Sequence, residues 1–399
     1  MRVLYWSPYV GHVGTIKAVV NSARAFRKYG GHEVTLIKNH SEWEGNEALL
    51  HSSGVQIFDF GLKKYFPNLY RTSPLGSRLY MLTVALFGFF QLFSYIRKHR
   101  PDLLVANLVV IPAVLCTRLF RNPPKLVISI QGFPKFLGEH GAGYPLWMRA
   151  EDSIRKFLWN RIYNDAELLV CMTPSTKDKL KNRTALAPGK LVVINNPIVD
   201  DLIHDQSLQS IDDAWLFDNE SSTVVAIGRL TPQKDFRTLI RAVELVRSIL
   251  PIKVAVLGEG ELRDKLQAEI DSRGLQNCIR LYGFVPNPYA YLARAKLFVL
   301  TSRWEDPGHA ILEAAALRVP IVSTDCPSGP AALLSNGLAG ELCPVGNHEC
   351  LAEKMVDTLK QNSTAKVQIA FENAQRFSLE AHYKALRPYL EKWRRLDES

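Results

Sequence analysis

The stretch KLFVLTSRWEDPGHAILEAAALRVPIVSTD, residues 296–325, decides the fold of this chain. It begins with an apolar run, 296–302, and ends with a second one, 320–325. Such continuous apolar runs are typical of parallel strands that are buried on both faces. Between them, residues 309–318 are rich in alanine and leucine, which favour a helix. The stretch therefore predicts a strand–helix–strand unit of a doubly wound sheet.

The same alternation continues through the rest of the chain. In the second half, strands are expected at 222–230, 252–260 and 279–285, and helices at 235–249, 261–274, 288–295 and 351–362. In the first half, strands are expected at 2–6, 33–37, 55–60, 101–108, 125–132 and 167–173, and helices at 15–30, 79–96 and 147–166. The pattern predicts an α/β protein of two doubly wound, Rossmann-like domains that face each other across a cleft.

The boundary between the two domains is expected within residues 190–205, where an apolar run ends in an Asn-Pro turn. A more polar stretch follows as far as Ser222, as is common in domain linkers. We therefore expect an N-terminal domain over 1–197 and a C-terminal domain over 198–375. Residues 376–399 are expected to form a helix that packs back on the N-terminal domain.

Composition places limits on the partner and the compartment. The chain has 399 residues, 47% of them hydrophobic, and a net charge of +10, which favours an anionic nucleic acid, phosphorylated ligand or membrane. Its six cysteines form no C-x-x-C pair, which argues against a zinc site or a disulfide framework and suits a reducing cytosol. The N-terminal MRVLYWSPYV is too short and too polar for a signal peptide.

The segment LYMLTVALFGFFQLFSYI, residues 79–96, allows two interpretations. Its 18 residues are close to the lower limit for a membrane span, but Thr83, Gln91 and Ser94 interrupt it. It is either a buried helix or a helix that also touches the membrane interface, with the flanking basic residues near lipid phosphates.

The quoted stretch also carries chemistry at the end of its first strand. Glu305 follows that strand, Gly308 lets the backbone turn, and the helix is expected to begin near His309. A helix N-terminus of this kind favours anions. Glu313 lies eight positions after Glu305, so the two carboxylates could hold different parts of one ligand. Two glutamates at this spacing also occur by chance in most proteins.

Two cations lie in and just after the turn that ends the strand-and-turn segment 222–230. Arg229 and Lys234 can point at one ligand, a guanidinium fork and a point charge suited to a diphosphate. They could instead be solvated cations, but that position is unfavourable near the positive end of a helix dipole unless an anion is present. The conjunction of these cations with the paired carboxylates favours a ligand site.

Glycines follow three other strands. Gly258 and Glu259 form either a plain turn or a wall of a nucleotide site, and the backbone near Val285 could contact a flat base. Gly11 and Gly14 allow backbone amides to approach an anion. Since they do not form a G-x-G-x-x-G fingerprint, a nicotinamide cofactor is not indicated.

Five motifs in this order carry a resemblance to a known family: GRLTPQK, GEGELRDKL, YGFVPNPY, SRWEDPGHAILEAAA and VSTDCPSGPAALL. They resemble the retaining glycosyltransferases of group 1 (family 4), which adopt the GT-B fold. The resemblance covers nearly the whole chain and is most specific over 222–345. It implies transfer of a sugar from a nucleotide-sugar to an acceptor hydroxyl, with retention of configuration and without a metal or another cofactor.

The resemblance also implies roles for single residues. Arg229 and Lys234 would bind the donor diphosphate and stabilise the leaving nucleotide. Glu305 would contact hydroxyls of the donor sugar, and Glu313 those of the ribose. The remaining contacts implied are the amides around Gly308, His309 and Ala310 on phosphate and sugar, Gly11 and Gly14 under the diphosphate, and Val285 near the base.

The expected acceptor site departs from the family pattern. Many relatives carry a histidine at a strand end of the N-terminal domain, whereas the matching positions here are Asn107 and Gln131. Gln131 could supply a hydrogen bond instead, and His12 could also reach the site.

The segments TDCPSGP and WEDPGHA resemble enzymes that build bacterial surface polysaccharides, often on polyprenyl-diphosphate lipids and with UDP-sugars. We therefore expect a UDP-sugar donor, a lipid-linked acceptor and a cytoplasmic enzyme peripheral to the membrane. An epimerase on the same fold and a non-catalytic anion-binding protein are the alternatives. Nucleic-acid binding is not favoured, because the basic residues are spread out and no aromatic-basic module is present.

Overall fold

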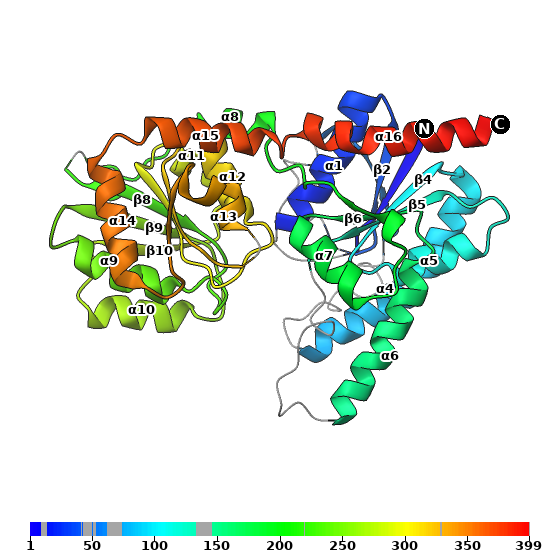
Figure 1. Cartoon of the computed structure of the whole chain (residues 1–399), viewed down its shortest axis with the longest axis horizontal. Helices are drawn as coiled ribbons and strands as arrows, with labels where there is room; N and C mark the ends of the chain where they lie inside the picture. The colour runs from blue at the N-terminus through cyan, green and yellow to red at the C-terminus, as the bar shows by residue number, and fades with distance from the viewer. Residues whose placement is uncertain are drawn as a thin grey trace. The chain divides into compact units, whose positions relative to one another are not determined.

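The computed structural model describes residues 1–8, 14–40, 42, 50, 53–61, 74–132, 146–218, 220–327 and 329–398. The chain divides into two compact units (Figure 1). Unit 1 comprises Met1–Pro197 together with Leu379–Ser399, and unit 2 comprises Ile198–Ser378.

Unit 1 is built on a parallel sheet with the strand order β3-β2-β1-β4-β5-β6-β7. The strands are β1 (Arg2–Trp6), β2 (Glu33–Lys38), β3 (Gln56–Asp59), β4 (Leu103–Asn107), β5 (Lys125–Ile130), β6 (Leu168–Cys171) and β7 (Leu191–Val193). The central strands are continuous apolar runs buried on both faces, which is why the sequence showed no alternation. This order confirms the predicted doubly wound sheet.

Helices cover both faces of the unit 1 sheet. On one face, α1 (Gly14–Gly30) and α16 (Leu379–Glu398) share a core cluster with β1, β2 and β4. On the other face, α4 (Pro74–His99), α5 (Ile111–Arg118) and α7 (Pro174–Arg183) share a second cluster, against which α6 (Leu146–Tyr163) packs. The helix α16 thus returns to unit 1 after the chain has formed unit 2.

A buried chain of hydrogen bonds holds α16 to α1 and β1. The His382 Nδ1 lies 2.8 Å from the Asn195 carbonyl oxygen, which can only accept, so Nδ1 carries the proton. The Nε2 atom therefore accepts from the Ser22 hydroxyl at 2.8 Å, and the Tyr5 hydroxyl donates to Ser22 at 2.8 Å. Complete burial lowers the pKa of His382 to about 4, so the ring is neutral at pH 7.

The helix expected at 79–96 is part of the longer α4. Leu92 and Ile96 on its inner side are buried, but Leu86, Phe87 and Phe90 are 56%, 47% and 69% exposed. The interpretation as a wholly buried helix is therefore wrong for the outer face, because only one side of α4 meets the sheet. Across the described part of the chain, no helix has both the length and the apolar character needed to cross a membrane.

Unit 2 repeats the architecture with the strand order β10-β9-β8-β11-β12-β13. The strands are β8 (Ser222–Ile227), β9 (Ile252–Leu257), β10 (Ile279–Gly283), β11 (Leu297–Leu300), β12 (Ile321–Thr324) and β13 (Glu341–Cys343). The sheet is parallel throughout, and Val224 of β8 lies opposite Leu297 of β11. The strand order reverses between β8 and β11, which is where ligands of such sheets bind.

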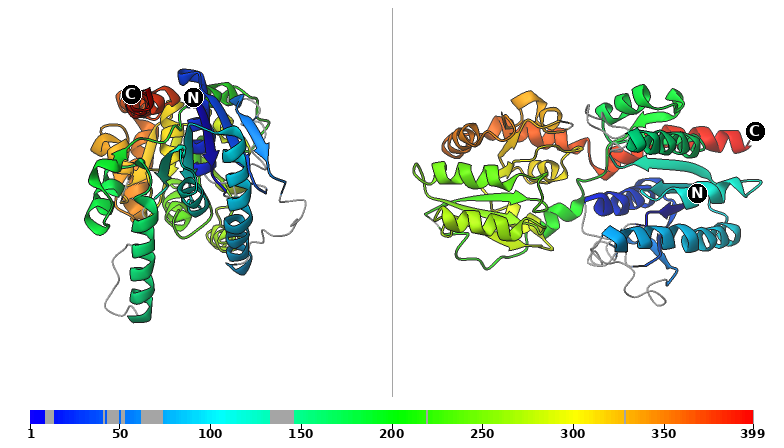
Figure 2. Two further views of the ribbon diagram at one scale, coloured as in Figure 1. Left: turned by 90° about the vertical axis from the view of Figure 1, so that its right-hand side faces the viewer. Right: turned by 90° about the horizontal axis from the view of Figure 1, so that it is seen from below.

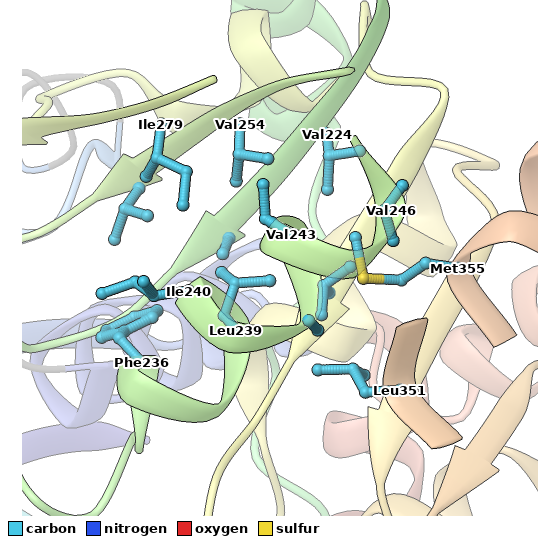
Figure 3. Close-up of a cluster of buried hydrophobic side chains, with 14 of the residues drawn as sticks. Val224, Phe236, Leu239, Ile240, Val243, Val246, Val254, Ile279, Leu351 and Met355 are labelled. Carbon is cyan, nitrogen blue, oxygen red and sulfur yellow. The ribbon is translucent and has the colours of Figure 1, made fainter. Parts of the chain in front are cut away.

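The unit 2 helices are α8 (Asp201–Ser207), α9 (Phe236–Val246), α10 (Arg263–Ser272), α11 (Pro288–Leu292), α12 (His309–Ala316), α13 (Pro330–Leu333), α14 (His348–Lys360) and α15 (Thr364–Gln375). Figure 3 shows the main core, in which Val246 of α9 lies near Val224 of β8 and Met355 of α14. This packing fixes the sheet whose strand ends carry the candidate site.

Candidate active site

The candidate site lies at the carboxyl ends of β8 and β11, on either side of the switch point of the unit 2 sheet. The turn after β8 carries Arg229 and Lys234, and the turn after β11 carries Glu305. Because the two strands are hydrogen-bonded neighbours, their turns emerge at the same edge of the sheet. The fold thus brings together charged residues that are 71 positions apart in the chain.

Lys234 and Glu305 form a largely buried ion pair. The Lys234 Nζ lies 2.5 Å from Oε1 of Glu305, and the two side chains are only 15% and 7% exposed. The Ser302 hydroxyl donates to the same Oε1 at 2.5 Å. Among the described residues the other oxygen, Oε2, has no hydrogen-bond partner, so the carboxylate keeps one oxygen available for a ligand.

Further bonds between the two turns fix this pair. The Gln233 side-chain amide donates to the Trp304 carbonyl at 2.9 Å, and the Arg303 amide donates to the Gln233 carbonyl at 2.8 Å. The Thr301 hydroxyl donates to the Lys234 carbonyl at 2.7 Å. The positions of Lys234 and Glu305 are therefore set by backbone contacts as well as by their charges.

Arg229 has a different environment. Its side chain is exposed, and its guanidinium meets only Gln233 Oε1, at 3.5 Å, with no carboxylate partner in the described part of the chain. It precedes the N-terminus of α9, where an unpaired cation is unfavourable unless an anion is bound. This arrangement suits an anionic ligand that contacts both Arg229 and Lys234.

Glu313 lies on α12, whose N-terminus follows the Glu305 turn. The helix begins at His309 with Gly308 at its N-cap position, as expected from the sequence, and Ala310 is in its first turn. The Glu313 side chain is buried, and the Tyr289 hydroxyl of α11 donates to its Oε1 at 3.0 Å. Tyr289 was not singled out by any sequence signal.

A third turn, after β12, packs against the Glu305 turn. The Glu305 amide donates to the Pro327 carbonyl at 3.3 Å. A Cβ atom at Gly329 would lie 2.0 Å from the Pro307 carbonyl oxygen, so only glycine fits there. Burial, and then the neighbouring Glu305 carboxylate, raise the pKa of Cys326 to about 12, so its thiol stays protonated.

Gly258 and Glu259 have contacts of their own within the sheet edge. A Cβ atom at Gly258 would lie 2.0 Å from the Gly228 carbonyl oxygen, so this glycine allows the turns after β9 and β8 to touch. Glu259 is half exposed and pairs with Arg263 at 2.9 Å. Val285 is half-buried just beyond β10. The close packing of the turns after β9 and β8 is enough to explain why residue 258 is a glycine.

The predicted acceptor residues belong to unit 1. Asn107 ends β4 and Gln131 follows β5, and the Gln131 amide lies 3.5 Å from Asn107 Oδ1 and 2.6 Å from Ser129 Oγ. The Asn196 amide donates to Gln131 Oε1 at 3.2 Å, a contact that the sequence did not suggest. Asn107 is 2% exposed, and its Nδ2 has no partner among the described residues.

These amides are among the residues that line a cavity of about 30 Å³ in unit 1, room for roughly two water molecules. Gly14 is the first residue of α1, whereas Gly11 and His12 lie outside the described residues. No cluster of three or more metal-binding side chains occurs within the described ranges.

Comparison with known families finds matches to both halves of the chain. Residues 209–376 match the family "Glycosyl transferases group 1", and residues 14–202 match "Glycosyltransferase Family 4". The two matches together cover every strand of both sheets except β1, which precedes residue 14.

Two curated relatives match about the same share of the chain. An uncharacterized glycosyltransferase of Methanocaldococcus jannaschii is 29% identical over 61% of this chain and 61% of its own. The N-acetylgalactosamine-N,N'-diacetylbacillosaminyl-diphospho-undecaprenol 4-alpha-N-acetylgalactosaminyltransferase of Campylobacter jejuni is 27% identical over 63% of this chain and 65% of its own. The alignments thus span less than two thirds of either relative.

Among solved structures, the Anabaena protein HepE in complex with UDP and glucose has the same fold. Its TM-score is 0.70 at 18% identity, and the superposition covers 98% of this chain and all of HepE. At this identity the likeness establishes the two-domain GT-B fold and no more.

Proposed function

This chain belongs to the group 1 glycosyltransferases, and we propose that it is a retaining enzyme that transfers a sugar from a UDP-sugar to the hydroxyl of a lipid-linked saccharide. The observation that carries the proposal is the site at the β8–β11 switch point. There an exposed Arg229, which has no carboxylate partner among the described residues, lies in the same turn as Lys234, and Lys234 is bonded to Glu305.

The two cations would hold the donor diphosphate. Arg229 supplies a fork of N–H donors, and Lys234 supplies a point charge close to the sugar-binding carboxylate. As the bond between sugar and phosphate breaks, negative charge grows on the departing diphosphate, and these fixed cations stabilise it without a metal. The amides at the start of α12, around His309 and Ala310, add partial positive charge on the same ligand.

The two carboxylates would hold the two sugars of the donor. Glu305 Oε1 is fixed by Lys234 and Ser302, so Oε2 is left to accept from hydroxyls of the transferred sugar. Glu313, held by Tyr289, would accept from the ribose hydroxyls. With the donor fixed in this way, the acceptor hydroxyl attacks from the face that the nucleotide leaves, and the departing phosphate takes its proton.

The identity of donor and acceptor is supported by the relatives. HepE is solved with UDP, and the Campylobacter jejuni enzyme is named for a saccharide on diphospho-undecaprenol. An enzyme with a lipid-linked acceptor must act at a membrane surface. The net charge of +10 favours binding to an anionic membrane. We therefore place the enzyme peripherally on the cytoplasmic face of the membrane, in surface-polysaccharide synthesis.

A panel of nucleotides tests the donor site. The purified chain is heated with UDP, GDP, UDP-sugars, NAD and DNA, with and without a chelator, and the melting temperature is recorded. We expect UDP and a UDP-sugar to raise the melting temperature by the same amount with and without the chelator. NAD and DNA are expected to leave the melting temperature unchanged. A shift with GDP-sugars alone would reject the UDP donor, and no shift with any nucleotide-sugar would reject the site.

Product analysis then tests the reaction. The chain is incubated with the stabilising UDP-sugar, with and without a polyprenyl-diphosphate saccharide, and the products are followed by NMR. The expected product is an α-linked saccharide from an α-linked donor, formed only with the acceptor. A changed sugar nucleotide without acceptor would indicate an epimerase, and binding without turnover would indicate a non-catalytic protein.

A further inference from the structure

The outer faces of α4, α5 and α6 in unit 1 carry an unusual concentration of exposed apolar side chains. The structure leaves 20 large apolar side chains exposed among the described residues, and nine of them lie on α4, on α6, or on α5 and its C-cap Leu119. We call these outer faces the three-helix surface. Its most exposed members are Leu86, Phe90, Leu119, Ile154, Phe157 and Leu158, each at least half exposed.

The three helices form one continuous layer. Helix α5 packs against α4 on one side and α6 on the other, and the inner sides of all three meet the same core cluster. Figures 1 and 2 show them side by side on one side of the unit 1 sheet, with α6 projecting beyond it. Their exposed apolar side chains are therefore directed away from the sheet, and a patch of this kind marks an interaction site.

The same helices are strongly basic. Together they contain eight lysines and arginines but only two acidic residues, both on α6. In the described part of the chain Arg97, Lys98, Arg149, Lys156 and Arg161 form no ion pair, so their charge is not neutralised by the protein itself. On α6 basic and apolar residues are interspersed, since Arg155 and Lys156 lie between Ile154 and Phe157 in the sequence.

We propose that the three-helix surface docks on an anionic lipid bilayer. Aromatic and aliphatic side chains gain by entering the boundary between headgroups and acyl chains, and each basic residue near anionic lipid adds about 1 kcal/mol. A second copy of the chain would bring two basic surfaces together, and a nucleic acid would leave the apolar side chains in water. A bilayer satisfies both features.

The proposal rests on the proposed function, because it locates the contact between a peripheral glycosyltransferase and the membrane that holds its acceptor. It also extends the sequence expectation, which considered only residues 79–96. The structure adds α5 and α6, whose exposed residues Leu119 and Phe157 are far from that segment in the chain.

Vesicle flotation of the full chain tests the docking. Vesicles of phosphatidylcholine alone are compared with vesicles that also contain phosphatidylglycerol, at low and high salt. We expect binding to the anionic vesicles and its reduction by salt, since surface charges are screened. Binding that is the same for both vesicle types, or no binding, would overturn the proposal.

Matched variants locate the binding surface. Phe90→Ser and Phe157→Ser are each expected to weaken partitioning into anionic vesicles by about tenfold, the effect of withdrawing one aromatic side chain from the interface. Leu208→Ser and Leu338→Ser in unit 2 change side chains that are 69% and 66% exposed and are expected to have no effect. Thermal melts of all four establish that they are folded.

Two results would contradict this assignment. One is an equal loss of vesicle binding in the unit 2 controls, and the other is a wild-type dimer in analytical ultracentrifugation that Phe157→Ser dissociates. Transfer to a water-soluble acceptor is measured in parallel and is expected to be unchanged in both Phe variants. Vesicle binding without any transferase activity would reject the proposed function and leave the docking surface intact.

Discussion

At the scale of single residues, the buried pair of Lys234 and Glu305 dominates the candidate site. Neither charge is well solvated, since the side chains are 15% and 7% exposed. Removing one partner of such a pair leaves the other charge uncompensated, at a cost of about 3–5 kcal/mol. A useful variant of Glu305 must therefore keep the shape of the side chain and its contacts with Lys234 and Ser302, so that loss of the charge is the only change, and a thermal melt must establish that it is folded.

Glu305→Gln meets that requirement. We expect kcat/KM for transfer to fall about 10- to 100-fold, because a hydrogen bond from a donor hydroxyl to a charged acceptor contributes about 1.5–3 kcal/mol. Steady-state kinetics measure the loss, and Glu391→Gln, which removes an exposed ion pair with Arg387, is the control. Wild-type kinetics in the Glu305 variant would exclude a role in sugar binding.

Tyr289 is predicted to position Glu313. Tyr289→Phe removes only the hydroxyl that donates to Glu313 Oε1. A hydrogen bond of this kind contributes about 0.5–1.5 kcal/mol, so we expect the KM for the donor to rise about 3- to 10-fold with kcat little changed. Tyr291→Phe, a half-buried neighbour on the same helix, is the control. A fall in kcat at constant KM would contradict a role in holding the ribose.

The sequence identified the charged members of the site but not the residues that position them. Lys234 and Glu305 are conspicuous because charged residues follow apolar strands directly, yet their pairing across 71 positions emerges only from the sheet order. Ser302, Tyr289 and Asn196 are ordinary polar side chains in turns and short helices. Tyr289 and Asn196 contact partners that are 24 and 65 positions away, so no local pattern could reveal them. Ser302 lies only three positions before its partner Glu305, but an isolated serine in a turn carries no distinctive signal.

At the scale of elements, the turns after β11 and β12 act as one unit because their backbones touch. Gly329 lies so close to the Pro307 carbonyl that a side chain would displace the turn carrying Glu305. The same relation holds between Gly258 and Gly228 in the turns after β9 and β8. Substitution at such glycines moves a functional side chain without touching it.

Gly329→Ala tests this coupling. We expect transfer activity to fall at least tenfold, while the melting temperature falls by only a few degrees, because the strain is confined to two turns at the edge of the sheet. Gly189→Ala is the matched control, since a Cβ atom there has no neighbour within 4 Å. Equal activity in the two variants, measured at a temperature where both are folded, would show that the turns move independently.

His382 makes the stability of unit 1 dependent on pH. Burial lowers its pKa to about 4 in the folded chain, whereas an unfolded histidine has a pKa of about 6.5. Between these values the unfolded state binds the extra proton, so stability falls as the pH falls from about 6.5 to about 4. The upper limit of this loss is about 3 kcal/mol, and none of it is present above pH 7.

His382→Gln removes that titration. We expect the variant to be less stable than wild type at pH 7, because the bonds with Ser22 and Asn195 are weakened. Its free energy of unfolding in urea should nevertheless change less between pH 6.5 and pH 4. Parallel pH profiles for variant and wild type would contradict the assignment of the proton to His382.

The sequence predicted long elements better than short ones. Apart from β13, the strands of both sheets follow from apolar runs, and the helices α1, α9 and α16 follow from helical periodicity. The eight-residue α5 and the three-residue β13 do not, because they are too short to show a period. Helix α4 extends from Pro74 to His99, beyond the expected 79–96, because helix ends depend on local packing as well as on apolar content.

At the scale of the whole molecule, the two units have the same kind of parallel sheet, but they differ in the number of chain segments that form them. Unit 2 is a single segment, Ile198–Ser378, whereas unit 1 is interrupted and depends on α16. Leu379, Tyr383, Leu386, Leu390 and Trp393 of α16 are buried in the unit 1 core. Burying five such side chains contributes roughly 8–15 kcal/mol, which is comparable with the whole stability of a domain.

Truncation should therefore affect the two units differently. We expect a chain ending at Ser378 to lose the cooperative unfolding transition of unit 1, while residues 198–378 expressed alone unfold cooperatively. Calorimetry and circular dichroism measure both, and the full chain is the control. A truncated chain that retains both transitions would show that α16 is dispensable for unit 1.

The return of α16 sets an order of events during translation. A ribosome must make the 181 residues of Ile198–Ser378 before it reaches the helix that closes unit 1, which takes roughly 10–40 s at ordinary elongation rates. Throughout that interval the nascent first unit presents an open apolar face to the cell. Unit 2 can mature first although it is made second, and chaperones have their main opportunity to bind at that face.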